Sequence, residues 1–160
     1  MRILVALGGN ALQRRNVEQT ATALASLTAE HEVIVTHGSV PRIGHMLELA
    51  LRNRLPDRDV VSVLTQVVVN GEDSEPCAIA EVRSLRVLVG SGALVICAGG
   101  GIPIALNGDG TMHEVEAAID KDLTAALLAR RLDADLLLTL TDMARVAQGE
   151  AGTQVVATRR

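Results

Sequence analysis

Residues 2–10 of the chain read Arg-Ile-Leu-Val-Ala-Leu-Gly-Gly-Asn, an apolar run that stops at a pair of glycines. A run of this length without polar alternation is typical of a strand buried on both faces of a parallel sheet. Gly8 and Gly9 leave the backbone uncovered, so its N–H groups can approach an anion closely. The stretch therefore predicts an α/β protein with ligand-binding segments at the ends of its strands.

The remainder of the chain alternates further apolar runs with amphipathic segments. The runs predict strands at 33–36, at 60–64 with an extension through 67–69, at 93–98, at 136–141 and, shorter, at 154–157. Helical spacing predicts helices that begin near Val17, at Pro41, at Ser74 to Pro76 and after Asp120, the last with Leu123, Ala126 and Leu127 pointing inward. The alternation predicts a single domain over residues 1–160, a three-layer αβα sandwich around a mostly parallel central sheet.

Composition narrows the function classes. The chain is 48% hydrophobic and 21% charged, with a net charge of −4 and no basic stripe, so nucleic acid is not a predicted partner. The uncharged stretch 87–106 is long enough to cross a membrane, but its glycines and Pro103 favour a helix end, a turn and a buried strand instead. Cys77 and Cys97 are too few for a disulfide framework or a cysteine metal site, which suits a reducing cytoplasm.

Two features of the composition are informative. The chain has no Phe, Tyr or Trp, so its core must consist of aliphatic side chains, and extra burial against a second chain would be useful. Lys121 is the only lysine among 15 basic residues. Any chemistry that needs an ammonium group therefore has one candidate.

Polar or glycine-rich segments follow several of the predicted strands. They are Gly8-Gly9-Asn10, Thr36-His37-Gly38-Ser39, Gly99-Gly100-Gly101 and Thr141-Asp142. Because ligands of parallel sheets bind beyond the carboxyl ends of the strands, several such segments favour a phosphorylated ligand. Each glycine taken alone is explained as well by the steric needs of a turn. Neither G-x-x-x-x-G-K-[ST] nor G-x-G-x-x-G occurs, which disfavours a P-loop and a dinucleotide fingerprint.

Blocks along most of the chain resemble carbamate kinases, within the amino-acid kinase family. The blocks are Val-Ala-Leu-Gly-Gly-Asn-Ala (5–11), Thr-His-Gly (36–38), Leu-Thr-Gln-Val-Val-Val (64–69), Cys-Ala-Gly-Gly-Gly-Ile-Pro (97–103), Val-Glu-Ala-Ala-Ile-Asp-Lys-Asp (115–122), Asp-Ala-Asp-Leu (133–136) and Leu-Thr-Asp (140–142). Ala6 stands where many relatives that phosphorylate amino acids carry a lysine. The resemblance implies an amino-acid-kinase-like fold in a shortened form.

The resemblance also implies an activity: reversible phosphoryl transfer from ATP to carbamate, giving ADP and carbamoyl phosphate, with Mg²⁺ bound to the ATP. It implies a cytoplasmic enzyme of arginine metabolism that forms a homodimer. In such a reaction the protein positions the reactants and neutralises the charge of the moving phosphoryl group.

The resemblance assigns roles to individual residues. Lys121 contacts phosphate oxygens, and Asp120 or Asp122 orients Lys121 and the glycine amides. The remaining site residues divide into three groups: Gly8, Gly9 and Asn10 donate to the transferred phosphoryl group, Gly38, Ser39 and Gly99–Gly101 hold the small anion, and Thr141 and Asp142 border the nucleotide. A plain helix cap also explains Asp120 to Asp122. His37 is interpreted as structural, without a catalytic role.

The sequence departs from the family pattern in ways that leave other functions open. Ser39-Val40-Pro41-Arg42 stands where the family continues Asn-Gly-Pro-Gln. A lid-like subdomain with its own lysine has no counterpart between Glu75 and Leu94, and the family's terminal lysine-bearing helix is absent. Two alternatives follow: a weak or inactive remnant that binds nucleotide or phosphate, and a kinase for another small carboxylate or phosphate.

Overall fold

The computed structural model of the chain describes residues 1–9, 11–38, 41–70 and 75–140. Seven strands lie in this part: β1 (Arg2–Leu7), β2 (Glu32–His37), β3 (Val60–Asn70), β4 (Glu75–Ile79), β5 (Leu94–Leu106), β6 (Met112–Glu114) and β7 (Leu136–Leu140). The helices described are α1 (Val17–Leu27), α2 (Pro41–Arg54), α3 (Val82–Gly90) and α4 (Lys121–Arg131). Strands and helices alternate as the sequence predicted, except that β4 follows β3 and β6 follows β5 without an intervening helix.

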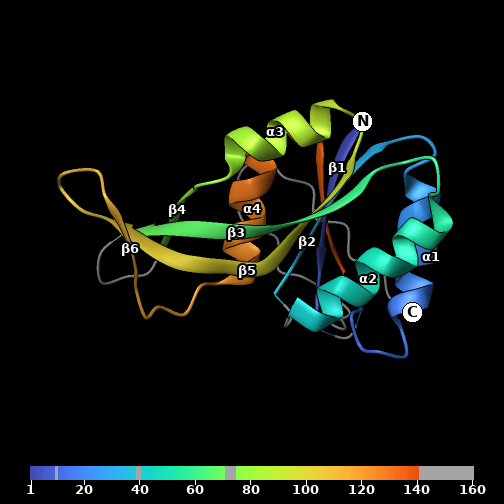
Figure 1. Ribbon diagram of the computed structural model, residues 1–160, viewed down its shortest axis with the longest axis horizontal. Coiled ribbons are helices and arrows are strands. Elements are labelled where there is room, and N and C mark those ends of the chain that lie inside the picture. Colours follow the sequence, from blue (N-terminus) through green and yellow to red (C-terminus); the bar gives the residue numbers. More distant parts are fainter. Residues whose placement is uncertain (10, 39–40, 71–74, 141–160) are drawn as a thin grey trace.

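The strands form one sheet in the order β4-β3-β5-β2-β1-β7, with β6 paired to β5. The four inner pairings, β3 with β5, β5 with β2, β2 with β1 and β1 with β7, are all parallel. Only β4 and β6 run antiparallel to their neighbours. Figure 1 shows β3 and β5 extending beyond the helices, where β4 and β6 flank them. The predicted α/β class with a mostly parallel sheet is confirmed.

Helices cover both faces of the sheet. On one face, here called the α1/α2 face, Ile3, Val5 and Leu7 of β1 pack with buried residues of α1 and α2. On the α3/α4 face, Leu4 and Ala6 pack with buried residues of α3 and α4. Successive residues of a strand point to opposite faces, so an apolar strand serves both layers. All of the largest fully buried side chains are leucine, isoleucine or valine.

The region after β3 differs from the sequence-based prediction. A helix was expected from Ser74-Pro76, but Glu75–Ile79 forms β4, and the helix begins only at Val82. Two hydrogen bonds to Gln66 of β3 explain the difference. The Ala80 N–H donates to the Gln66 carbonyl oxygen (3.0 Å), and the Gln66 N–H donates to the Glu81 carboxylate (2.8 Å). Antiparallel pairing with the preceding strand, β3, here overrides the local cap signal.

Two further expectations were wrong. Gly99–Gly101 was predicted as a loop, but these residues continue β5, which runs to Leu106. The pairing with β3 shifts register here, because Leu64 pairs with Ala98 and Gln66 with Ile102, so the extra residues lie in β5. Leu123 was expected to point inward and is 52% exposed, whereas Leu127 is buried. The strand predicted at 154–157 lies outside the described residues. Among the described helices, none is long and apolar enough to cross a membrane.

The two cysteines have different surroundings, which predicts different reactivity. Burial, and secondarily the charge of Glu81, raises the pKa of the Cys97 thiol to about 12. The Cys77 thiol is only partly buried and donates to the Val68 carbonyl oxygen (3.2 Å). Because the thiolate is the reactive form, iodoacetamide at pH 8 should label Cys77 in the folded protein and Cys97 at least about 10²-fold more slowly. Peptide mass spectrometry before and after unfolding in urea checks this, and equal labelling rates would contradict it.

Candidate active site

The carboxyl ends of the central strands meet at one edge of the sheet. Leu7, the last residue of β1, pairs with His37 of β2 on one side and with Leu140 of β7 on the other. Gly8 extends this arrangement, since its N–H donates to the Leu140 carbonyl oxygen (2.8 Å). The Gly8 amide is thus engaged within the sheet. The glycines after β1 and Gly38 after β2 lie at this same edge.

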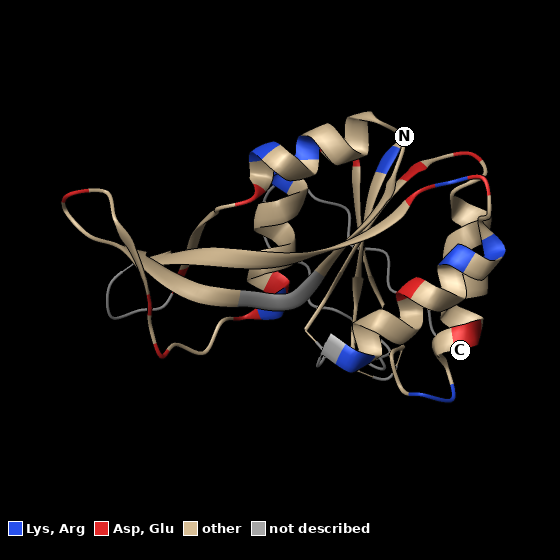
Figure 2. Cartoon of the chain, in the orientation of Figure 1, with Lys and Arg blue, Asp and Glu red and all other residues tan. Residues whose placement is uncertain are grey.

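The amino end of α4 reaches this edge from the α3/α4 face. Asp120 caps the helix, and its side chain accepts from the N–H groups of Asp122 (2.7 Å) and Leu123 (3.0 Å). Lys121 is the first residue of the helix, and its Nζ donates to Asp122 Oδ1 (2.7 Å). Figure 2 shows acidic and basic residues adjoining at the start of α4. A helix amino end and an ammonium group both favour a bound anion.

Lys121 packs directly against the end of β2. A Cβ atom placed on Gly38 would lie 3.6 Å from Cβ of Lys121 and 3.7 Å from its Cδ. A small cavity of about 10 Å³ lies at this contact, lined by Ala6, Leu7, Thr36, His37, Gly38, Lys121 and Asp122. Its volume is about that of one water-sized probe, so a larger anion would sit at its mouth. The structure therefore brings Gly38, Lys121 and Asp122 together.

The other predicted site residues have varied placements. Gly8 and Gly9 follow the neighbouring strand, and Asp120 orients the start of α4 through its cap. Thr36 of β2 pairs with Cys97 of β5, and β2 ends one residue later. Residues 99–101 of β5 therefore extend beyond the end of β2, at the edge of the sheet that carries the site. Asn10, Ser39, Thr141 and Asp142 lie outside the described residues. Among the described residues, no three His, Cys, Asp or Glu side chains are grouped as metal ligands.

Sequence reasoning gave Ala6 and Thr36 no binding role and missed Gly44 altogether. Ala6 was noted only for the lysine that many relatives carry there, and Thr36 only as part of a polar segment, yet both line the cavity. Gly44 of α2 lies against the His37 ring, where a Cβ atom would approach Nε2 to 2.6 Å. A glycine in the first turn of a predicted helix was the one available signal, because glycine disfavours a helix unless close packing requires it.

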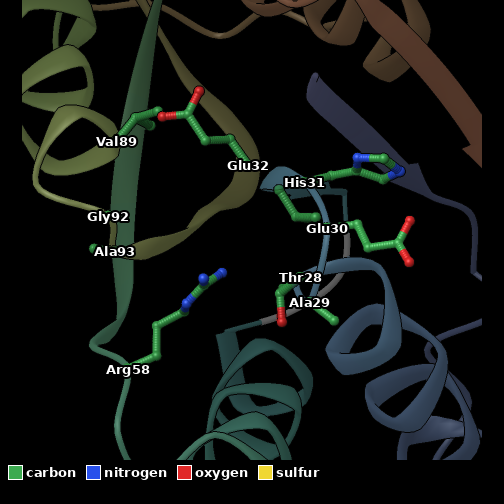
Figure 3. Close-up of a pocket in the computed structure, with 10 residues that line it drawn as sticks. Thr28, Ala29, Glu30, His31, Glu32, Arg58, Val89, Gly92 and Ala93 are labelled. Atoms are coloured by element: carbon green, nitrogen blue, oxygen red, sulfur yellow. The ribbon is translucent and has the colours of Figure 1, made fainter.

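A larger cavity of about 250 Å³ lies at the opposite edge of the sheet (Figure 3). Its lining includes Glu32 at the start of β2, Ala93 before β5 and Arg58 before β3. Thr28 and Gly92, which follow the carboxyl ends of α1 and α3, also line it. Helix carboxyl ends carry partial negative charge, and together with Glu30 and Glu32 they offset Arg58. This cavity is less suited to a phosphoryl group than the edge that carries Lys121.

Comparison with known proteins identifies the family. A carbamate kinase of Rhizobium meliloti is 33% identical over 236 aligned positions, which cover 93% of this chain and 73% of the relative. The chain belongs to the carbamate kinase family. A carbamate kinase of Pyrococcus horikoshii is 28% identical and covers 89% of this chain and 74% of the relative. No family model matches the chain.

Solved carbamate kinase structures share the fold. A structure of Giardia carbamate kinase superposes with a TM-score of 0.82 at 26% identity, covering 91% of this chain and 74% of that one. Carbamate kinase from Giardia lamblia bound to AMP-PNP gives a TM-score of 0.79 at 28% identity, covering 88% and 70% of the two chains. The fold and the sequence thus indicate the same family.

This member of the carbamate kinase family is shorter than its relatives within the matched region. The alignment with the Rhizobium meliloti enzyme spans 236 positions, more than the 160 residues present here, so segments of the relative have no counterpart. The structure is consistent with this, because only Ala80 and Glu81 separate β4 from α3. The lid was expected to be missing between Glu75 and Leu94, a stretch that includes this short connection.

Proposed function

We propose that the chain catalyses reversible phosphoryl transfer between ATP and carbamate, forming ADP and carbamoyl phosphate. One observation carries the proposal: the only ammonium side chain lies at the capped amino end of α4, against the end of β2, and shares a small cavity with Ala6 and Leu7 at the end of β1. Membership of the carbamate kinase family supports it. The AMP-PNP bound to a Giardia lamblia relative supports nucleotide binding by this chain.

The chemistry follows from the charges at this edge. A carbamate oxygen attacks the γ-phosphorus while the bond to the bridging oxygen of ADP breaks, and negative charge spreads over the phosphoryl oxygens. Lys121 neutralises part of this charge, and the first N–H groups of α4 add their positive end. Asp122 holds the Lys121 ammonium in place through its 2.7 Å contact. Mg²⁺ enters as part of the nucleotide substrate.

Further parts of the proposal concern the cellular setting. The chain acts as a homodimer in the cytoplasm, in arginine metabolism. Exposed apolar side chains support self-association: Leu64 is 54%, Leu106 56% and Met112 58% exposed. Light scattering at several protein concentrations checks the dimer, and a constant monomer mass would contradict it.

The activity is tested by coupling ATP formation from ADP and carbamoyl phosphate to a luciferase readout. Turnover that requires both substrates and Mg²⁺ is the expected result. Absence of turnover together with thermal stabilisation by ATP would instead identify a binding module that has lost catalysis. Turnover with acetyl phosphate but not with carbamoyl phosphate would identify a kinase for another small carboxylate.

Gly9→Ala should lower activity at this site without changing the stability of the fold. A Cβ atom on Gly9 meets no atom within 4 Å and the residue does not adopt positive φ, so stability should change by less than about 0.5 kcal/mol. The added methyl group would stand beside the path of the phosphoryl group, and kcat/KM for ATP formation should fall about tenfold. Gly108→Ala, in the turn between β5 and β6, is the matched control because its Cβ also meets nothing. Equal activity of the two variants would place the phosphoryl group elsewhere.

A further inference from the structure

Helix α2 approaches the His37 side chain more closely than any residue but glycine allows. A Cβ atom built on Gly44 would lie 2.6 Å from Nε2 of His37 and 2.9 Å from its Cε1. Real Cβ contacts essentially never fall below 3.0 Å. His37 is only 2% exposed, so its ring has little room to move away. The contact therefore requires a glycine at position 44.

This contact lies one residue from the candidate active site. His37 pairs with Leu7, whose side chain belongs to the α1/α2 face, and its ring meets α2 there. The next residue, Gly38, lies against the Lys121 side chain of α4. A Cβ atom placed on Gly38 would lie 3.6 Å from Cβ of Lys121. The end of β2 is thus held between two helices on opposite faces of the sheet. His37, Gly38 and Lys121 all line the same small cavity.

Gly44 is the fourth residue of α2, in the first turn of the helix. Glycine disfavours a helix relative to alanine, and the contact with the His37 ring is the reason that the structure offers for a glycine here. The cavity next to His37 measures about 10 Å³, so a shift of the β2 end by a fraction of an ångström changes its size substantially. A displacement of the His37 ring would carry Gly38, the next residue, toward or away from Lys121.

We infer that Gly44 and His37 are positioning residues that fix the gap between Gly38 and Lys121 and thereby set the subsite for the small acceptor anion. The inference rests on the proposed carbamate kinase activity for its substrate, but the positioning itself does not depend on turnover. The inference concerns only the contact between Gly38 and Lys121, so the KM for the nucleotide is not expected to respond.

Gly44→Ala tests the inference through its effects on two Michaelis constants, one for carbamoyl phosphate and one for ADP. The KM for carbamoyl phosphate should rise about tenfold, while the KM for ADP should change less than about twofold. Gly90→Ala is the matched control, because Gly90 is also helical and its Cβ meets no atom within 4 Å. That control should leave both constants unchanged. An equal rise of both KM values in Gly44→Ala, or no rise, would overturn the inference.

A second variant tests whether the effect passes through the histidine ring. His37→Ser removes the atoms that a Cβ on residue 44 would strike. In the His37→Ser background, adding Gly44→Ala should therefore produce no further rise in the KM for carbamoyl phosphate. If Gly44→Ala costs the same factor in both backgrounds, the two residues act independently and the inference is wrong.

The reactivity of Lys121 gives a readout that needs no turnover. Lys121 is the only lysine, so acetylation by an N-hydroxysuccinimide ester, mapped by peptide mass spectrometry, reports on its surroundings separately from the amino terminus. Gly44→Ala should change this rate by at least about threefold relative to Gly90→Ala, because the β2 end that covers the lysine stem moves. An unchanged rate would overturn the positioning role.

The two proposals fail in different ways. A chain that forms no ATP but whose Lys121 labelling responds to Gly44→Ala would refute the proposed activity and support the positioning role. If Gly44→Ala does not fold, His37→Ser replaces it, since it opens space at the same contact and should shift Lys121 labelling likewise. Unchanged labelling in a folded His37→Ser variant would overturn the inference.

Discussion

Replacing Lys121 by methionine is expected to lower kcat/KM for ATP formation from ADP and carbamoyl phosphate by about 10²- to 10³-fold. Methionine keeps a flexible unbranched side chain that can still pack against Gly38, but it removes the positive charge. No second lysine exists in the chain to take over. The coupled ATP-formation assay, run on protein with an unchanged melting temperature, measures the effect.

Two further variants sharpen this result. Lys121→Arg keeps the charge but not the compact ammonium geometry, so it should recover only part of the activity. Asp122→Asn removes the carboxylate that holds Nζ at 2.7 Å and should cost less than loss of the lysine itself. A Lys121→Met protein as active as the parent would show that the ammonium has no part in the reaction.

Replacing Leu128 by alanine should lower the free energy of unfolding by about 3 kcal/mol. Leu128 is fully buried on α4 and packs in the α3/α4 face cluster, where the chain has no aromatic side chain to collapse into the cavity. For a domain of this size the melting temperature should fall by about 10 °C. Urea denaturation followed by far-ultraviolet circular dichroism measures the change.

Leu123→Ala on the same helix provides the matched control. Leu123 is 52% exposed, so its truncation should cost less than about 0.5 kcal/mol. Similar losses for the two variants would mean that α4 is rotated relative to the structure described above. The pair thus also tests the correction to the predicted inward face of this helix.

Local signals predicted those parts of the fold that depend on local physics. The apolar run of β1 and the Asp120 cap of α4 were both predicted from a few adjacent residues, and both are confirmed. The residues after β3 were mispredicted because pairing of β4 with β3 is decided by contacts with Gln66, which a cap motif does not reveal. Leu123 was misplaced because apolar spacing alone did not show that Ala125 and Leu128 carry the buried face of α4.

The candidate site likewise could be predicted from the sequence only in part. Lys121 stood out because it is the only lysine, and Gly38 because it follows a predicted strand. Their proximity across the sheet edge could be expected only from family resemblance, since 83 positions separate them in the sequence. The contact between Gly44 and His37 left no pattern beyond an isolated helical glycine. Such contacts depend on the relative placement of whole elements.

The purely aliphatic packing on both faces of the sheet makes the protein almost transparent near 260–280 nm, about the range where aromatic residues and adenine absorb. An adenine nucleotide held at the carboxyl edge would be the only strong chromophore in the complex. Its induced circular dichroism could therefore be followed directly, without subtracting a protein background and without attaching a dye.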